Sequence, residues 1–494
     1  MTSPQAIPEL DARRQTVADR LAACLPADAL LVHPEELAPY ECDGLSAYRR
    51  SPLLVALPGS ADEVRSVLTI CRDLQVPVVA RGAGTGLSGG ARPLAEGVLL
   101  NMSRMNRILE VDVDNRLARV QPGVRNLQVS EAVASQGLYY APDPSSQIAC
   151  SVGGNVAENA GGVHCLKYGL TVHNVAAVEI ATIDGDLLTL GARGPDAPGY
   201  DLLALLHGSE GLLAVVTEVT VRLLPVPRFA QVAVAAFDAV DAAGDAVARI
   251  VASGILPAGL EMMDRGCIDA VNDFLDVSYP SCEALVLCEL DGTEEEVQSQ
   301  LERVGRLLEE TGATSIRMSG SEEERLKLWS GRKAAFPAVG RISPDYYCMD
   351  GTIPRRHLAR VLNEIRRLSD HYGLPVVNVF HAGDGNMHPL ILYDANREGE
   401  METAERLGGE ILEACVAVGG TITGEHGVGI EKIDQMCVQF TSEELQQFHD
   451  IKRAFDPDGL LNPGKAVPTL ARCAEFGAMH VHRGELPFPE LERF

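Results

Sequence analysis

The sequence predicts an α+β protein with two principal domains, and three patterns lead to this class. The first 80 residues end in an apolar strand, an amphipathic helix and a second apolar strand. Short alternating strands follow, with one clear hairpin, and the second half mixes strand-rich segments with amphipathic helices. The chain's 494 residues suffice for roughly two to four domains.

The elements of the first half can be taken in order. We expect a helix over residues 10–25 and a short buried strand over 53–57. Ser60 and Glu63 have the spacing of a capping box, so a helix should begin there and lead to the strand VPVVA, residues 76–80. The strands GVLLNM, ILEVDV and RLARVQP follow, then a helix over 126–136. In the hairpin VEIATIDGDLLTL, Asp184 and Gly185 suit a tight turn.

The strand AVVTEVTVRLLPVP runs into prolines, which places a domain boundary near Pro227. Beyond it come the strands VAVAAF, ALVLCEL and VVNVF and the amphipathic helices EEEVQSQLERVGRLLEE and RRHLARVLNEIRRLSDHYG. The predicted divisions are an N-terminal helical segment (1–50), a ligand-binding domain (51–227), an α+β cap with an antiparallel sheet (228–460) and a C-terminal docking segment (461–494).

Composition excludes several functions. A net charge of −27 without a basic patch argues against nucleic-acid binding. The sequence has no apolar run long enough for a spanning helix and no signal-like start, so a cytoplasmic location is expected. The 12 cysteines include no C-x-x-C. They are expected to be buried thiols, with neither disulfides nor an iron–sulfur cluster held by this chain.

A glycine-rich loop, RGAGTGLSGG, directly follows the strand VPVVA. Backbone without side chains can turn its amides toward a phosphate, so this composition favours an anion-binding loop. The dinucleotide fingerprint does not fit, because Gly82, Gly84 and Gly86 are spaced G-x-G-x-G and Leu87 replaces the final glycine. A Walker loop does not fit either, because no G-K-[ST] follows. A flexible turn is the alternative for this loop alone.

A second glycine-rich segment spans residues 142–169, PDPSSQIACSVGGNVAENAGGVHCLKYG. Its residues are too small and too polar for a packed core. Two such segments in one domain require an extended ligand. A dinucleotide fits, with its pyrophosphate on one segment and its ring system near the other.

These two segments and GSEGLLAVVTEVTVRL resemble the FAD-binding domain of flavoproteins of the vanillyl-alcohol oxidase type. HAGDGNMHP, TGEHGVG and FDPDGLLNPGK resemble the C-terminal cap of the D-lactate and D-2-hydroxyglutarate dehydrogenases in that family. The resemblance covers nearly the whole chain. It implies a two-subdomain FAD-binding domain followed by an α+β substrate-binding cap with an antiparallel sheet.

The resemblance also implies FAD that is bound non-covalently, because neither Leu87 nor Ser88 is a histidine and His164 lies elsewhere in the motif order. The implied pyrophosphate contacts are Arg81, Gly82, Ala83, Gly84, Thr85, Gly86, Leu87, Ser88, Gly89 and Gly90. The implied flavin and ribityl contacts are Pro142, Ser151, Gly153, Gly154, Asn159, Gly161, Gly162 and Tyr168. Glu210 and Gly211 would meet the adenosine side, and Asn462 would return to the cofactor from the C-terminal segment.

Two histidines, His381 and His388, flank the turn AGDGNM after the strand VVNVF. Two imidazoles from one loop can form half of a metal site, with ligand distances of about 2.0 Å. Glu425 and His426 lie in a second glycine-bracketed turn, TGEHGVG. Spacing alone leaves the alternative that these histidines are exposed or hydrogen-bonded to protein.

In the dehydrogenases that the chain resembles, two histidines and a glutamate bind a divalent metal, usually zinc. The resemblance therefore implies a metal ion held by His381, His388 and Glu425. It implies His426 as the catalytic base and Asn386 as a polar or substrate contact. Where the hydroxyglutarate enzymes have a lysine, YYCMDG has Cys348, so a long diacid should bind poorly.

Oxidation of a 2-hydroxyacid requires a base for the hydroxyl proton, a cation for the carboxylate and an acceptor for the hydride. Metal binding lowers the pKa of the hydroxyl, so a neutral imidazole at His426 can take its proton at about pH 7. Arg332, in LWSGRKAAF, can hold the carboxylate by two parallel hydrogen bonds, and its place after Trp329 matches the family's substrate arginine. The alternative for Arg332 is a solvated helix arginine, and Lys333 and Lys432 are weaker candidates.

The expected function is FAD-dependent oxidation of glycolate or D-lactate. The tail CAEFGAMHVHRGELPFPELERF and the segment YYCMDGTIPRR resemble multi-subunit members of the family. The implied partners are an iron–sulfur subunit and a second flavin-type subunit, through which alone the chain would reach the inner face of the membrane. A stand-alone D-lactate dehydrogenase, a metal-dependent hydrolase without flavin and a flavin-binding scaffold with an inactive site are the alternatives.

Overall fold

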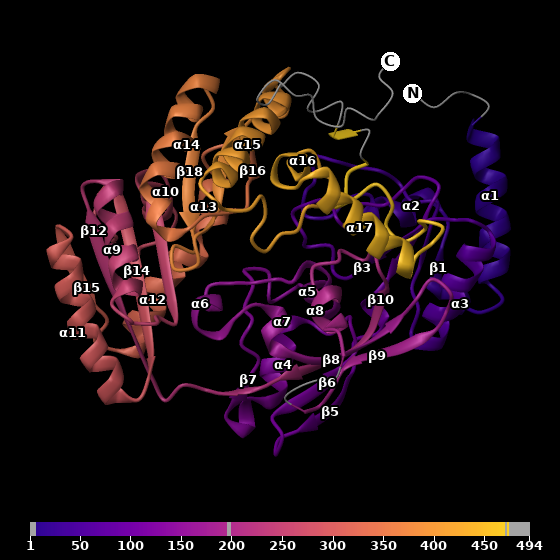
Figure 1. Cartoon of the computed structure of the whole chain (residues 1–494), viewed down its shortest axis with the longest axis horizontal. Helices are drawn as coiled ribbons and strands as arrows, with labels where there is room; N and C mark the ends of the chain where they lie inside the picture. The colour runs from indigo at the N-terminus through magenta and orange to yellow at the C-terminus, as the bar shows by residue number, and fades with distance from the viewer. Residues whose placement is uncertain (1–5, 195–198, 470–471, 474–494) are drawn as a thin grey trace. The chain divides into compact units, whose positions relative to one another are not determined.

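A computed structural model describes residues 6–194, 199–469 and 472–473. The chain forms two compact units (Figure 1). Unit 1 comprises Met1–Ala160, Leu170–Pro225 and His426–Phe494, and unit 2 comprises Gly161–Gly169 and Val226–Glu425. Residues 474–494 of the predicted C-terminal docking segment lie outside the described residues.

Unit 1 contains a four-stranded sheet in the order β1-β2-β4-β3. β2, β4 and β3 are parallel, and β1 pairs antiparallel to β2. The predicted β-α-β unit is β2, α3 and β3, and α3 begins where expected, because Ser60 Oγ accepts the N–H of Glu63 at 3.3 Å. The elements are α1 (Ala6–Leu21), β1 (Leu30–Leu31), β2 (Leu54–Ala56), α3 (Ala61–Asp73), β3 (Val78–Arg81) and β4 (Val98–Asn101).

A five-stranded antiparallel sheet, β5-β6-β10-β8-β9, completes the framework of unit 1. The predicted hairpin is β8–β9, and Gly185 in its turn has φ +84. The strands are β5 (Ile108–Asp112), β6 (Leu117–Val120), β8 (Val175–Ala181), β9 (Leu187–Gly191) and β10 (Val215–Arg222). The accompanying helices are α4 (Asn126–Val133), α5 (Val152–Glu158), α8 (Leu202–Leu206) and α17 (Ser442–Phe455).

Unit 2 is built on a seven-stranded antiparallel sheet in the order β15-β12-β14-β13-β18-β20-β16. A short pair, β17 and β19, carries part of the histidine turn. The strands are β12 (Phe229–Phe237), β13 (Gly259–Asp264), β14 (Ala284–Gly292), β15 (Ser315–Met318), β16 (Asp345–Cys348), β17 (Gly351–Thr352), β18 (Val376–Phe380), β19 (Asn386–Met387) and β20 (Pro389–Tyr393).

Helices pack on this sheet because its strands are apolar on both faces. Val232, Val234 and Ala236 of β12 join one core cluster with α10, α12 and α13. Helices α9 and α11 pack on β12 and β14, and α14 packs on α9 and α15. The helices are α9 (Val240–Ala252), α10 (Arg265–Phe274), α11 (Glu294–Glu310), α12 (Glu322–Lys333), α13 (Ala335–Val339), α14 (Leu358–Tyr372) and α15 (Glu400–Ala417). The predicted α+β class is confirmed.

One expectation from the sequence is wrong. Cys437, on α16 (Met436–Gln439), and Cys473 form a disulfide. Their Cα atoms lie 5.3 Å apart, within the range that a disulfide spans. The two cysteines are 36 residues apart in sequence, so no local motif could signal this pairing. The other ten cysteines form no disulfide in the described part of the chain.

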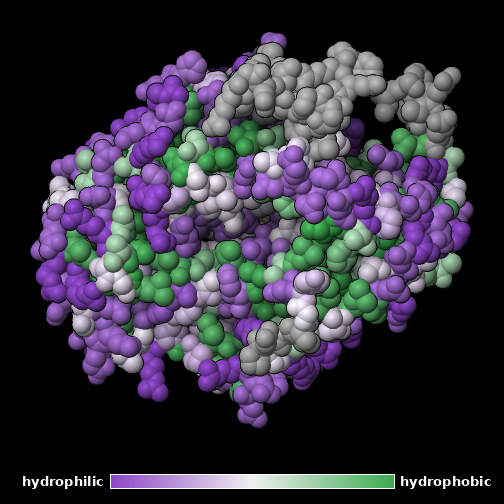
Figure 2. All heavy atoms as spheres, viewed as in Figure 1, coloured by the Kyte–Doolittle hydropathy of each residue, from purple (hydrophilic) through white to green (hydrophobic). Residues whose placement is uncertain are grey.

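The surface mixes residue types. On the face drawn in Figure 2, hydrophilic residues are interspersed with smaller areas of hydrophobic ones. Within the described ranges, no helix has both the length and the apolar character needed to cross a membrane.

Candidate functional site

The two glycine-rich segments that were predicted to share one ligand meet inside unit 1. A Cβ atom placed on Gly82 would lie 2.1 Å from Oγ of Ser151, at the start of α5. Only a residue without a side chain allows this close approach. The carbonyl of Gly82 also accepts a hydrogen bond from Asn101 Nδ2 at 3.3 Å.

The C-terminal segment returns to the end of this loop. Asn462 Nδ2 donates to the carbonyl oxygens of Gly90 at 3.0 Å and of Glu210 at 2.6 Å. Lys465 Nζ donates to Gly90 O at 2.8 Å. Three predicted cofactor residues from distant segments, Gly90, Glu210 and Asn462, are therefore joined by hydrogen bonds. Lys465 was not predicted and holds the same carbonyl.

Orphaned polar atoms at this loop fit a bound cofactor. Ser88 Oγ and Asn462 Oδ1 are buried and have no hydrogen-bond partner among the described residues. Buried polar atoms normally have partners, so these two are suited to bind a ligand. A Cβ atom on Gly86 would meet nothing within 4 Å, which leaves space at the middle of the loop. Arg81 provides a cation here, and its Nη1 donates to Cys42 O at 2.6 Å.

Other predicted cofactor residues have protein partners. Asn159 ends α5 at φ +51, and its Oδ1 accepts the N–H of Val172 at 3.0 Å. Tyr168 belongs to unit 2 together with Gly161 and Gly162, and its hydroxyl donates to Asp291 Oδ2 at 2.6 Å. Their cofactor roles stay predictions.

The predicted metal ligands converge inside unit 2. The ligand atoms of His381, His388 and Glu425 all lie within 4.8 Å of one another. Oε1 of Glu425 faces His381 Nε2 at 3.3 Å and His388 Nε2 at 3.0 Å. A tetrahedral ion with ligand distances of roughly 2 Å separates its ligand atoms by about 3.3 Å. The two separations from Glu425 Oε1 are therefore close to the spacing of ligand atoms around a divalent ion.

The carboxylates and imidazoles of this cluster shift one another's pKa values. Burial alone would lower the pKa of His381, but the carboxylates of Glu261 and Glu425 raise it to about 10. Burial alone would raise the pKa of Glu425, yet hydrogen bonds and charge from His381 and His388 hold it well below its usual range. An ionised carboxylate therefore faces two imidazole nitrogens.

Glu261 of β13 was missed by the sequence analysis. It is fully buried, and its Oε1 accepts a hydrogen bond from His381 Nδ1 at 2.7 Å. Its Oε2 accepts one from Arg332 Nε at 2.6 Å. A carboxylate behind a metal-binding histidine fixes the ring's orientation and leaves Nε2 for the ion. The available signal was an acidic residue inside the otherwise apolar strand GLEMMD.

Asp350 holds the turn that carries Glu425, the third predicted ligand. The sequence did not predict this role either. Asp350 is fully buried, and its carboxylate accepts the N–H groups of Gly424 at 3.0 Å and Glu425 at 3.2 Å. It also accepts the hydroxyl of Thr423 at 2.7 Å. These bonds fix the turn that carries Glu425. An aspartate between a strand and a glycine, in CMDG, was the only local signal.

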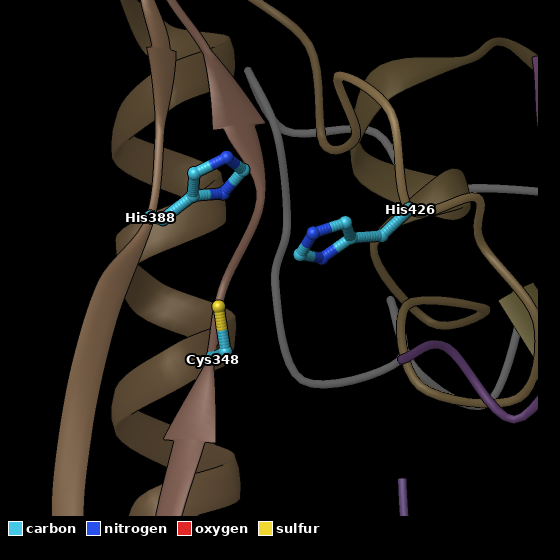
Figure 3. A group of neighbouring side chains, drawn as sticks. All are labelled: Cys348, His388 and His426. Carbon is cyan, nitrogen blue, oxygen red and sulfur yellow. The ribbon is translucent and has the colours of Figure 1, made fainter. Parts of the chain in front are cut away.

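Asn386 and Cys348 lie in the same unit. Asn386 Oδ1 is buried and has no hydrogen-bond partner within the described part of the chain. Cys348 is buried at the end of β16, and in Figure 3 its Sγ points toward the imidazole of His388, which precedes the neighbouring strand β20. Figure 3 also labels His426, which follows Glu425 directly in the chain and begins the last stretch of unit 1.

Arg332, at the end of α12, is not a solvated helix arginine. Only 3% of its surface is exposed. Its side chain makes a single hydrogen bond to the described residues, from Nε to Glu261, so both Nη groups remain available. A buried guanidinium with a free fork is suited to bind a carboxylate.

Two family models match the chain. The model "FAD binding domain" matches residues 52–191, and "FAD linked oxidases, C-terminal domain" matches residues 226–466. The chain is 64% identical to "Glycolate oxidase subunit GlcD" of Escherichia coli (strain K12), over 99% of this chain and 98% of that protein. It is 32% identical to "D-lactate dehydrogenase [cytochrome], mitochondrial" of Arabidopsis thaliana, over 84% of this chain and 74% of that protein.

A solved structure shares the fold. The structure of p-cresol methylhydroxylase with substrate bound matches with a TM-score of 0.78 and 17% identity, over 93% of this chain and 98% of that one. The segment YYCMDGTIPRR and the tail most resemble the FAD-linked chain of bacterial glycolate oxidase, and the comparisons confirm this prediction. The chain therefore belongs to the FAD-linked oxidases, as a homologue of the glycolate oxidase chain GlcD and an oxidoreductase of the 2-hydroxyacid type.

Proposed function

We propose that this chain oxidises glycolate to glyoxylate and D-lactate to pyruvate, and that its electrons pass to an iron–sulfur partner subunit. Similarity to a glycolate oxidase subunit and to a D-lactate dehydrogenase supports these substrates. The word "subunit" supports assembly with other chains, for which we propose the iron–sulfur protein and a second flavin-type subunit. A cytoplasmic location, with membrane contact only through these partners, stays a prediction.

The surroundings of Arg332 give the main structural support for the proposal. Its charge is buried, Glu261 occupies its Nε, and its two Nη groups point to no described partner. Leaving such groups without an acceptor is unfavourable, and the carboxylate of a 2-hydroxyacid supplies two acceptor oxygens in the matching geometry. Because Glu261 also holds His381 at 2.7 Å, one side chain links the proposed carboxylate and metal sites.

His381, His388 and Glu425 would hold a divalent ion, and two nitrogens with one carboxylate suit zinc. FAD would be held non-covalently by the glycine-rich segments and Asn462. A bound ion would lower the pKa of the substrate hydroxyl, and bound FAD would be the acceptor for the hydride from the α-carbon. His426 then takes the hydroxyl proton, Arg332 holds the carboxylate, and Asn386 Oδ1 offers a further acceptor. Loss of one hydride and one proton converts the hydroxyacid to the 2-oxo acid.

Anaerobic stopped-flow reduction of the bound flavin tests the proposal. We expect glycolate and D-lactate to bleach the flavin, with L-lactate and D-2-hydroxyglutarate at least about tenfold slower. Cys348 offers no cation for the distal carboxylate of a diacid, which is the physical reason for the last expectation. Equal or faster reduction by D-2-hydroxyglutarate would contradict the proposed substrates. A colourless protein that FAD cannot reconstitute would leave the hydrolase alternative standing.

A further inference from the structure

Glu210 has hydrogen bonds that its predicted cofactor role does not explain. Its carboxylate is buried, and its two oxygens accept the backbone N–H groups of Val428 and Gly429, each at 2.7 Å. These amides lie two and three residues beyond His426. Hydrogen bonds from amides to a charged acceptor are roughly twice as strong as neutral ones. Glu210 therefore holds the backbone of the loop that begins at His426.

The backbone of Glu210 is itself fixed in an unfavourable conformation. Its φ is +51, in the left-handed region, which persists in a non-glycine residue only where the surroundings enforce it. Its N–H donates to Ala157 O at 2.8 Å, and its carbonyl accepts Asn462 Nδ2 at 2.6 Å. Glu210 is thus a rigid anchor whose own position depends on α5 and on the C-terminal segment.

The loop after His426 is also held by Ser88, in the first glycine-rich segment. The N–H groups of Ile430 and Glu431 both donate to Ser88 O, at 3.0 and 3.2 Å. A Cβ atom on Gly429 would lie 2.1 Å from this oxygen, so the glycine is required for the approach. Lys432 Nζ donates back to Gly427 O at 2.8 Å. The loop after His426 is therefore tied on one side to Ser88 and on the other to Glu210.

A second carboxylate, that of Glu158, lies close to the same backbone and provides a control for Glu210. A Cβ atom on Gly427 would lie 2.1 Å from Glu158 Oε2 and 3.0 Å from Glu210 Oε1, so both side chains face this backbone. Glu210 accepts the neighbouring amides of Val428 and Gly429, whereas Glu158 Oε2 is buried without a hydrogen-bond partner among the described residues. Burial raises the pKa of both carboxyl groups, and for Glu210 the two amides and the lysines Lys432 and Lys465 oppose that rise.

We propose that Glu210 is a positioning residue for the oxidation: it orients His426 through the Val428–Gly429 backbone and couples that loop to the FAD-binding segment. The inference rests on the proposed role of His426 as the base. It assigns Glu210 an effect on proton removal from the substrate, beyond any effect on FAD binding. Because misplacement by about 1 Å can slow a reaction about 10²-fold, loosening one anchor should slow flavin reduction without removing the base.

The test compares Glu210→Gln with Glu158→Gln in the full-length, FAD-loaded protein. Glutamine keeps the shape of Glu210 but retains a single acceptor oxygen, so one of the two amides loses its partner. We expect Glu210→Gln to keep its flavin spectrum and its dithionite reduction, and to slow reduction by glycolate roughly 10- to 100-fold. Glu158→Gln should react within about threefold of the unaltered chain, because Glu158 Oε2 makes no hydrogen bond to the described residues.

A double variant separates positioning from a general structural role. If Glu210 acts through His426, the variant Glu210→Gln/His426→Ala should be no slower than His426→Ala alone, because the two effects are not additive. Full additivity, an unchanged rate in Glu210→Gln, or equal loss in Glu158→Gln would each overturn the inference. Should Glu210→Gln fail to retain FAD, Glu210→Asp takes its place, and FAD loss there too would overturn the inference. Normal reduction in His426→Ala would instead refute the proposed function.

Discussion

His426→Ala is expected to slow the reduction of bound flavin by glycolate about 10²- to 10⁴-fold, the usual contribution of a positioned general base. FAD should stay bound, because the glycine-rich segments and Asn462 are unchanged. The hydroxyl proton must leave as the hydride departs from the α-carbon, and the substitution removes the imidazole proposed to accept it. Anaerobic stopped-flow absorbance at saturating glycolate measures this rate, and dithionite reduction reports on the intact flavin.

A matched histidine controls for this result. His371 is exposed near the end of α14, so His371→Ala should reduce at the rate of the unaltered chain. Near-normal flavin reduction in His426→Ala would remove His426 from the mechanism. Loss of flavin from His426→Ala would show that the residue serves cofactor binding instead.

Arg332→Lys is expected to lower kcat/KM for glycolate by about 10²-fold, chiefly through a higher KM. A charge-assisted hydrogen bond to the substrate carboxylate contributes about 1.5–3 kcal/mol, and an ammonium group cannot form the two parallel bonds of the guanidinium fork. Lysine keeps a positive charge beside the buried Glu261, which avoids leaving that carboxylate unpaired. Steady-state kinetics over a range of glycolate concentrations separates KM from kcat.

Arg325 supplies the matched control, because it lies on the same helix and also pairs with a buried glutamate. Its Nη1 is 2.9 Å from Glu289 Oε2. Arg325→Lys should therefore leave the KM for glycolate unchanged, while any general damage to α12 should appear in both variants. An unchanged KM in Arg332→Lys would contradict the assignment of the substrate carboxylate to Arg332.

Local patterns were enough to predict the main elements of the fold. The capping pair Ser60 and Glu63, the β-α-β unit and the hairpin turn at Asp184 and Gly185 all follow from periodicity and from backbone preferences within a few residues. The His381 and His388 turn was predictable for the same reason, since both histidines follow one apolar strand. Such signals need no knowledge of where distant segments pack.

The supporting contacts could not be predicted, because the residues that make them are far apart in sequence. Glu261 bonds Arg332 71 residues away and His381 120 residues away, and Glu210 bonds Val428 across 218 residues. In the sequence, an acidic residue within an apolar strand has no evident role. Its role becomes clear only when the fold places a cation or an amide against it. The same limit applies to the disulfide of Cys437 and Cys473.

In the proposed mechanism, a divalent ion at His381, His388 and Glu425 anchors the substrate hydroxyl. The most direct test is the rate of flavin reduction by glycolate, measured before metal removal, after it and after the ion is restored. We predict that removal abolishes reduction by glycolate while dithionite still reduces the flavin, and that added zinc or another divalent ion restores the rate. An undiminished rate with glycolate in protein shown to be free of metal would contradict the account.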